Sequence, residues 1–512
     1  MASEVDEKGR QAESSDTEER SEKKSASTAG SDDAGTGGAT MEEVGGDSNA
    51  GVSEVSEEIS SLAVSEKGPD DDVDKPEITL RADKLNEEVE AAEPSQIKTI
   101  AAEDTPYTSA QTFEELNISE NLLRGIYSEM KFERPSKIQG ITLPMILSPP
   151  YHHLIAQAHN GSGKTTCFVL GMLSRVDPNL KAPQAICICP TRELAIQNEE
   201  VLLKMGKYTG ITSTCAISEF GKQTSSRRGP VVDQIIIGTP GTIKRWITSK
   251  ILNLRHIKIL VFDEADHMLA QDGFQDDSTR IIRYIVKDNG GCQVLFFSAT
   301  FDDTVKNFTV KIAPKANQVF VKKEELSLDV IKQYRVKCPR EADKVAVLKD
   351  RIFPAAEKLG QSIIFVRTRA SASNLHRRLD EDGYKCTSIQ GGLSNEERDR
   401  VIREFRCGQT RILIATDVLA RGFDQAQVTL VVNYDLPIKN SFPNDPDYEL
   451  YLHRIGRSGR FGRKGAAFNF LVTGTDEDNM NKISSYFNRE IPEVPWDDDD
   501  AFEKVLKEAG LA

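Results

Sequence analysis

This sequence of 512 residues lacks paired cysteine motifs, long apolar runs and a signal-like beginning. Its eight cysteines are scattered, and no two have the C-x-x-C spacing of zinc and redox sites. Scattered cysteines are typical of free thiols in a reducing compartment. No run of 18 apolar residues occurs, and the N-terminus has no apolar signal core. We therefore expect a soluble intracellular protein.

Negative charge is concentrated at one end of the chain. The net charge is −15, yet residues 1–100 alone hold 27 Asp and Glu against 10 Lys and Arg. The remainder is nearly balanced, which leaves room for a local basic channel. Residues 1–76 have few large apolar side chains, so we expect them to be disordered. Apolar residues within 78–93 predict a short regulatory helix, with a transient helix in a solvated tail as an equal alternative.

From about residue 107, short apolar runs alternate with helical patterns. Runs such as "HLIAQA", "AICICP", "QIIIGTP", "ILVFDEA" and "VLFFSAT" are each typical of a buried strand. The same alternation restarts at residue 361 with "QSIIFV". Strands that alternate with helices predict a parallel sheet covered by helices on both faces. The fold class expected is therefore α/β, with two such domains in tandem.

A phosphate-binding loop is predicted between one of these strands and the helix that follows it. "AHNGSGKTT", residues 158–166, has glycines that let backbone N–H groups close around phosphate oxygens at a helix N-terminus. Lys164 would reach the β- and γ-phosphates of a nucleotide, and Thr165 would bind Mg²⁺. The strict motif begins with glycine, where this chain has Ala158.

Three carboxylates, Asp263, Glu264 and Asp266, stand within four positions at the end of the strand "ILVFD". In phosphate-loop folds this strand end is expected beside the loop, where Asp263 would hold Mg²⁺, largely through water. Glu264 would orient or deprotonate the attacking water. Asp266 also suits the acidic first turn of a helix.

These motifs, taken together, resemble the DEAD-box family of ATP-dependent RNA helicases. D-E-A-D stands at residues 263–266, and "KFERPSKIQ" resembles the adenine-reading Q motif, which spans 111–139 with the upstream aromatic. "PTRELA", "TPGT" and "SAT" follow in the first domain, and "IIFVRTR", "ATDVLARGFD" and "HRIGRSGR" in the second. The likeness covers about residues 107–490 and implies two tandem RecA-like domains.

The resemblance assigns roles to individual residues. Glu264, Lys164, Arg457 and Arg460 would be catalytic, the two arginines by reaching the γ-phosphate across the cleft. Gln139 would read adenine through its amide, Phe113 would stack on the base, and Asp424 would contact the ribose. The ATP site would also include Ala158, His159, Asn160, Gly161, Ser162, Gly163, Lys164, Thr165 and Thr166.

A second set would bind RNA or couple the two sites. Asp266, Ser298 and Thr300 would link ATP to RNA. The RNA backbone contacts implied by the family are Thr191, Arg192, Gly241, Arg245, Arg367, Thr368, Gly391, Arg398 and Thr416. The second half has no phosphate loop of its own, so one ATP would bind and its site would be completed by closure of the domains.

The predicted organisation divides the chain into five segments. They are an acidic arm over 1–106, an ATP-binding domain over 107–320, a linker over 321–334, a C-terminal helicase domain over 335–492 and an acidic tail over 493–512. The segment 438–450 and the C-terminal ending resemble the subfamily that remodels mRNA–protein particles at the cytoplasmic face of the nuclear pore.

That resemblance implies partners and a location: single-stranded RNA, a pore nucleoporin, an export activator that acts with inositol hexakisphosphate, and residence in cytoplasm and nucleus near the pore. ATP and Mg²⁺ would be the cofactors. Two alternatives remain open. One is an ATP-gated RNA clamp without productive turnover, and the other is a phosphate-loop enzyme that acts on protein or DNA.

Overall fold

The computed structural model describes most of the chain from residue 98 onward. The described residues are 98–100, 108–158, 161–218, 229–270, 273–301, 303–320, 331–354, 360–420, 423–439, 445–459 and 463–511. The helix predicted over 78–93 lies outside them, as does nearly all of the acidic arm.

The first domain is built on a sheet that has eight strands among the described residues. Its strand order is β1-β8-β2-β7-β6-β3-β5-β4, and all neighbours are parallel except β1, which runs antiparallel to β8. The strands are β1 (Lys98–Ile100), β2 (Leu154–Gln157), β3 (Ala185–Ile188), β4 (Ser213–Ala216), β5 (Ile235–Gly238), β6 (Ile259–Asp263), β7 (Gln293–Ser298) and β8 (Asn317–Phe320).

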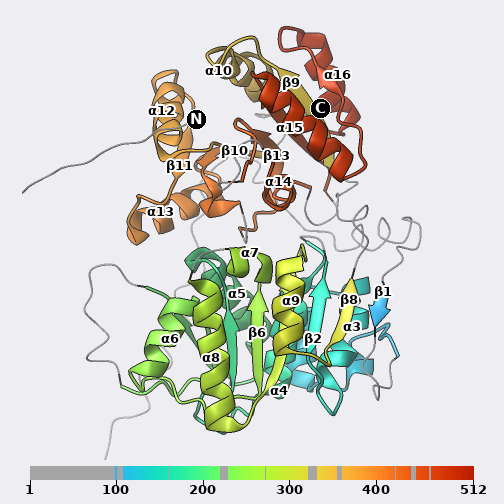
Figure 1. Ribbon diagram of the computed structural model, residues 1–512, viewed down its shortest axis with the longest axis vertical. Helices are drawn as coiled ribbons and strands as arrows, with labels where there is room; N and C mark the ends of the chain where they lie inside the picture. The colour runs from blue at the N-terminus through green and yellow to red at the C-terminus, as the bar shows by residue number, and fades with distance from the viewer. Residues whose placement is uncertain are drawn as a thin grey trace, which may run out of the picture. The chain divides into compact units, whose positions relative to one another are not determined.

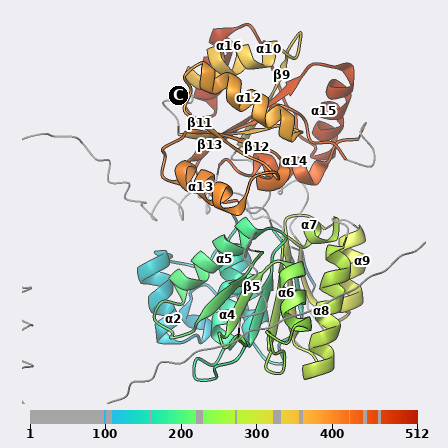
Figure 2. The ribbon, with the colours of Figure 1, turned by 90° about the vertical axis from the view of Figure 1, so that its left-hand side faces the viewer.

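Helices cover both faces of this sheet. They are η1 (Glu114–Leu116), α2 (Glu120–Arg124), η2 (Gly125–Met130), α3 (Lys137–Leu147), α4 (Lys164–Arg175), α5 (Arg192–Met205), α6 (Pro240–Thr248), α7 (Ala265–Ala270), α8 (Phe274–Asn289) and α9 (Asp303–Ile312). Figures 1 and 2 show α4 and α5 on one side of the strands and α8 and α9 on the other. Successive strand residues therefore enter different cores, as when Cys187 packs with α4 and α5 and Ile186 packs with α6 and α8.

The second domain repeats this plan with a sheet of seven described strands. Its order is β11-β12-β10-β13-β14-β9-β15, and all neighbours are parallel. The strands are β9 (Ile331–Lys337), β10 (Gln361–Phe365), β11 (Cys386–Ile389), β12 (Ile412–Ala415), β13 (Val428–Asn433), β14 (Gly465–Leu471) and β15 (Glu493–Val494).

Its helices also form two layers (Figure 2). Residues of α10, η4, α12 and α16 share one core, and residues of α13, α14 and α15 share the other. These elements are α10 (Asp343–Val347), η4 (Leu348–Ile352), α12 (Arg369–Glu381), α13 (Asn395–Arg406), η5 (Asp417–Leu419), α14 (Tyr448–Ile455), α15 (Gly474–Tyr486) and α16 (Asp499–Glu508). The two-domain α/β fold class expected from the sequence is confirmed.

Three details differ from the expectations. First, β7 lies between β2 and β6, so the phosphate loop and Asp263 follow strands that are separated by one strand. Second, β9 begins at Ile331, inside the segment assigned to the linker, because its residues pair with β14. Third, the acidic tail is folded: β15 pairs with β9, and α16 buries Phe502 and Leu506 in the core of the second domain.

No helix among the described residues is long and apolar enough to cross a membrane. All eight cysteines are free thiols. Burial raises the pKa of Cys187 well above its usual value, which keeps this thiol protonated and favours packing over metal binding.

Candidate functional site

The phosphate loop connects β2 to α4 in the first domain. Gly161 and Gly163 adopt positive φ angles of 84° and 97°, which favour glycine, and Lys164 is the first residue of α4. The Lys164 side chain is buried, and its Nζ donates to the carbonyl of Ala158 at 2.5 Å. The lysine thus lies folded along the loop, while Thr165 is half-buried beside it. His159 and Asn160 lie outside the described residues.

Gln139 of the Q motif is hydrogen-bonded to this phosphate loop. Its Nε2 donates to the Gly163 carbonyl at 3.3 Å, and its Oε1 accepts the backbone N–H of Ser136 at 2.9 Å. The second bond belongs to a capping box at the start of α3, which Ser136 completes by accepting from the Gln139 backbone N–H. A second link joins the Ser136 hydroxyl to the Ser162 carbonyl at 2.8 Å.

Phe113, which the resemblance assigned to base stacking, is fully buried in this structure. Its ring is 0% exposed in the core of the first domain and meets Tyr127 edge-on at 6.2 Å between centroids. A ring needs a free face to stack on a base, so in this structure Phe113 serves packing instead. Phe132, seven residues before Gln139, is half-buried at the start of the same motif and was missed by sequence reasoning.

Asp263, the last residue of β6, is held by the protein on both carboxylate oxygens. Its Oδ1 accepts the backbone N–H of Glu264 at 3.1 Å, and its Oδ2 accepts from Asn198 Nδ2 at 2.8 Å. Burial and the neighbouring charge of Glu264 raise the pKa of Asp263 to about 7, against the opposing influence of Asn198 and Lys164. A carboxylate in this setting is stabilised as an anion by a nearby cation.

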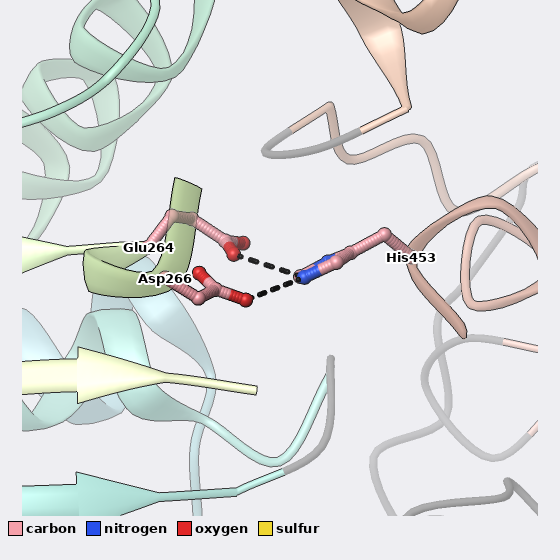
Figure 3. Close-up of side chains that lie close together, drawn as sticks. All are labelled: Glu264, Asp266 and His453. Carbon is pink, nitrogen blue, oxygen red and sulfur yellow. Dashed lines mark hydrogen bonds and ion pairs between the residues drawn. The ribbon is translucent and has the colours of Figure 1, made fainter. Parts of the chain in front are cut away.

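Glu264, Asp266 and His453 form a buried cluster between the two domains (Figure 3). His453 lies on α14 of the second domain, and its Nε2 is 3.0 Å from Asp266 Oδ2 and 3.6 Å from Glu264 Oε2. Since an ionised carboxylate only accepts, Nε2 is the donor to Asp266. Glu264 has a positive φ of 53°, a backbone conformation that is rare outside glycine.

The residues predicted to couple ATP to RNA lie around Asp266. Its Oδ2 accepts from the Thr300 hydroxyl at 2.5 Å, and its backbone N–H donates to the Ser298 hydroxyl at 3.4 Å. Ser298 ends β7, the strand between β2 and β6. The inserted strand therefore brings "SAT" into direct contact with the DEAD sequence.

Arg457 of the second domain is buried close to this cluster. Its Nε donates to the His453 carbonyl at 2.9 Å, and one of its terminal nitrogens donates to the Phe423 carbonyl at 2.5 Å. The backbone N–H of Asp424, the residue after Phe423, donates to Gln197 Oε1 of the first domain at 2.8 Å. Arg460 lies outside the described residues.

Two arginines predicted to bind RNA are instead paired with carboxylates of the other domain. Arg192 on α5 makes two hydrogen bonds to Asp399 on α13, at 2.6 and 2.8 Å. Arg398 contacts Glu193 at 3.2 Å, so the two pairs run in opposite directions between the same helices. These contacts favour a role in joining the domains, and RNA contact by either arginine stays a prediction.

The other candidates for RNA contact divide by exposure. Gly241, Arg245, Arg367 and Thr368 are exposed. Gly391 is half-buried, and a Cβ there would lie 3.0 Å from the guanidinium of Arg369. Thr191 caps α5 by accepting from the Leu194 backbone N–H, and Thr416 is 7% exposed. The exposed residues are accessible to a nucleic acid, although Thr368 caps α12 in the way that Thr191 caps α5, and Thr416 is buried.

Comparison with known proteins gives family matches across both domains. Residues 136–308 match the family described as DEAD/DEAH box helicase, and residues 343–462 match the helicase conserved C-terminal domain. The chain is 58% identical over 420 residues to DEAD-box ATP-dependent RNA helicase 38 of Oryza sativa subsp. japonica, covering 81% of this chain and 83% of that protein. It is 54% identical over 458 residues to the protein of the same name in Arabidopsis thaliana, covering 89% of each.

Solved structures agree with the sequence matches. S. cerevisiae Dbp5 bound to RNA and ADP BeF3 is 43% identical, with a TM-score of 0.73 over 78% of this chain and 100% of that chain. A variant of S. cerevisiae Dbp5 bound to Nup159, a Gle1 variant, IP6 and ADP is 41% identical, with a TM-score of 0.56 over 77% of this chain and 99% of that chain.

Proposed function

This chain belongs to the DEAD-box family of ATP-dependent RNA helicases, and from that membership we propose how its residues divide the work of RNA-stimulated ATP hydrolysis. The enzyme hydrolyses ATP to ADP and phosphate, and RNA binding promotes this turnover. The proposal rests above all on one observation: the DEAD carboxylates of the first domain meet His453 of the second in a buried cluster. The carboxylates that would take part in hydrolysis are therefore also the ones that contact the second domain.

On the nucleotide side, the backbone of residues 161–163 cradles the phosphates, and Lys164 turns from the Ala158 carbonyl to the β- and γ-phosphates. Thr165 and Asp263 would hold Mg²⁺, since a hydroxyl and a carboxylate are the hard oxygen ligands that this ion prefers. Bound there, Mg²⁺ would neutralise phosphate charge. Glu264 orients the attacking water and accepts its proton.

Adenine recognition is proposed for Gln139, because its amide can both donate to and accept from the Watson–Crick edge. To do so, the amide must exchange its bonds to Gly163 and Ser136 for bonds to the base. Phe132 is the better aromatic candidate for stacking, since it is half-buried whereas Phe113 has no exposed face. Asp424 is proposed to contact the ribose.

Catalytic help from the second domain is proposed for Arg457 and Arg460. An arginine that reaches the γ-phosphate stabilises charge in the transition state, and such residues are worth about 10³-fold or more in rate. To reach the γ-phosphate, the Arg457 side chain must give up its hydrogen bonds to the His453 and Phe423 carbonyls. The approach of Arg457 to the γ-phosphate therefore depends on the position of Phe423 in the "ATDVLARGFD" motif.

RNA is proposed to bind across both domains through its sugar–phosphate backbone, which gives little sequence preference. The exposed Arg245 of the first domain and the exposed Arg367 and Thr368 of the second support this role. ATP and RNA together would draw the domains closed, and hydrolysis would release them. The physical output is the remodelling of RNA–protein complexes.

The cellular role proposed is mRNA export at the nuclear pore, with the protein in the cytoplasm and nucleus. Similarity to the yeast protein solved with Nup159, Gle1 and IP6 supports this assignment, as does the subfamily likeness of the 438–450 segment. By the same likeness, we propose a nucleoporin and an activator that acts with inositol hexakisphosphate as partners.

The decisive test is steady-state ATP turnover by the full chain, with and without single-stranded RNA. Strong stimulation by RNA supports the proposal, and Glu264→Gln serves as the inactive control. RNA binding that depends on ATP but brings little or no ATP turnover would favour the ATP-gated clamp. Turnover that ignores RNA and responds to a protein or to DNA would favour the other phosphate-loop alternative.

A further inference from the structure

Asn198 is a fully buried amide that no recognised motif of the chain includes. It lies on α5 in the first domain, is 0% exposed, and points at the end of β6. Its Nδ2 makes two contacts, one with Asp263 Oδ2 at 2.8 Å and one with Cys189 Sγ at 3.3 Å. Both amide hydrogens of Asn198 are thereby used.

The orientation of the Asn198 amide follows from the charge of its partner, Asp263. In its ionised form, which is the form that binds Mg²⁺, the Asp263 carboxylate only accepts, so the NH₂ group of Asn198 and not its carbonyl faces it. The other carboxylate oxygen of Asp263 accepts the Glu264 backbone N–H at 3.1 Å. The carboxylate plane of Asp263 is thus fixed by two bonds, and every atom involved belongs to the first domain.

Stability alone does not explain an amide at this position. Asn198 Oδ1 is buried and has no hydrogen-bond donor among the described residues. A buried acceptor without a donor costs free energy, whereas an apolar side chain of similar size would pack here without that cost. The donation to Asp263 is therefore the property that distinguishes asparagine from leucine at this site.

We propose that Asn198 is a positioning residue that holds the Asp263 carboxylate in the orientation required for Mg²⁺ beside the bound nucleotide. The inference rests on the proposed nucleotide site and adds a residue outside it. Groups that hydrogen-bond a metal-binding side chain commonly contribute about 10- to 100-fold to metal affinity or activity. In this proposal Asn198 acts through its hydrogen bond to Asp263 and not through contact with the nucleotide or the metal.

The test measures ADP binding to the full chain by calorimetry, without RNA, at saturating Mg²⁺ and in EDTA. The ratio of the two affinities reports how strongly Mg²⁺ and nucleotide bind together. We expect Asn198→Leu to reduce this ratio by about ten-fold while ADP affinity in EDTA stays within two-fold of wild type. Asn198→Ala, which also removes the donor, should reduce the ratio by a similar factor.

Asn479→Leu is the matched control, since it removes an equally buried asparagine on α15 of the second domain. It should leave the ratio unchanged. An unchanged ratio in both Asn198 variants would overturn the inference, as would an equal loss of ADP affinity with and without Mg²⁺, which indicates a packing role only. If wild type itself showed no Mg²⁺-dependent ADP binding, the proposed nucleotide site would fail first, so the two failures are distinguishable.

Discussion

Exchanging the charges of Arg192 and Asp399 decides whether Arg192 mainly joins the domains or mainly binds RNA. The two side chains form a bidentate pair at 2.6 and 2.8 Å and are 17% and 38% exposed. Water and salt screen the pair because it is partly exposed, so we treat it as a surface ion pair. Since it is bidentate and less exposed than most surface pairs, we take the upper end of their range, about 1 kcal/mol. That free energy corresponds to about five-fold in the equilibrium for domain closure.

The assay is the RNA concentration that gives half-maximal ATP turnover. Arg192→Asp and Asp399→Arg should each raise it by about five-fold or more, because each loses the pair and also places like charges together. The double variant, with both charges exchanged, should return to within about two-fold of wild type. Arg400→Asp is the control, since Arg400 lies on the same helix but pairs with Glu404 of its own domain, at 3.8 Å.

Refutation would come from the double variant. If Arg192 acts mainly by contacting RNA phosphates, the exchanged pair stays as weak as Arg192→Asp alone, and Asp399→Arg leaves the RNA requirement unchanged or lowers it. Either result would show that Arg192 mainly contacts RNA, as the family resemblance predicts, and does not mainly join the domains.

Four further predictions follow from the same structure. Glu264→Gln should bind ATP and RNA yet lose about 10²-fold or more in turnover for want of a general base, whereas Lys164→Ala should weaken nucleotide binding; near-normal turnover by the Gln variant would contradict this role. ATP should support RNA-stimulated turnover and GTP should not, because guanine presents a different edge to Gln139, and equal catalytic efficiency with GTP would show otherwise. Deletion of residues 1–93 should raise turnover at low RNA and have less effect at saturation if the acidic arm competes with closure, and overlapping titrations would mean a solvated tail. Phe502→Ala should destabilise the second domain by about 3–5 kcal/mol in urea unfolding, because the ring is 1% exposed and packs 5.6 Å from Phe468.

The fold was predictable because each strand is an apolar run bounded by turns and each helix shows its own period. "ILVFD" and "QSIIFV" became β6 and β10 with nearly the expected limits. The strand order was not predictable in the same way. Nothing in the local pattern indicates that β7 enters between β2 and β6, yet this insertion is what places Ser298 against Asp266.

Side-chain roles were harder to predict than strands because they depend on neighbours far along the chain. Phe113 is buried by contacts that its own segment does not reveal, and Arg192 is paired with a residue 207 positions away. Asn198 had no sequence signal at all, since a single amide on an amphipathic helix is ordinarily a surface residue. Only the placement of α5 over the folded sheet brings it within hydrogen-bond distance of Asp263 at the end of β6.

The central claim is that ATP and RNA together close the two domains, and energy transfer between one dye on each domain measures this directly. Of the eight cysteines, Cys407 alone is exposed, and Val286→Cys would add a site on α8 of the first domain, where the native side chain is 52% exposed. Both would be labelled in the Glu264→Gln background, which should retain its ligands. The account predicts that transfer rises when ATP and single-stranded RNA are both present and stays lower with either alone. Equal transfer under all four conditions would contradict it.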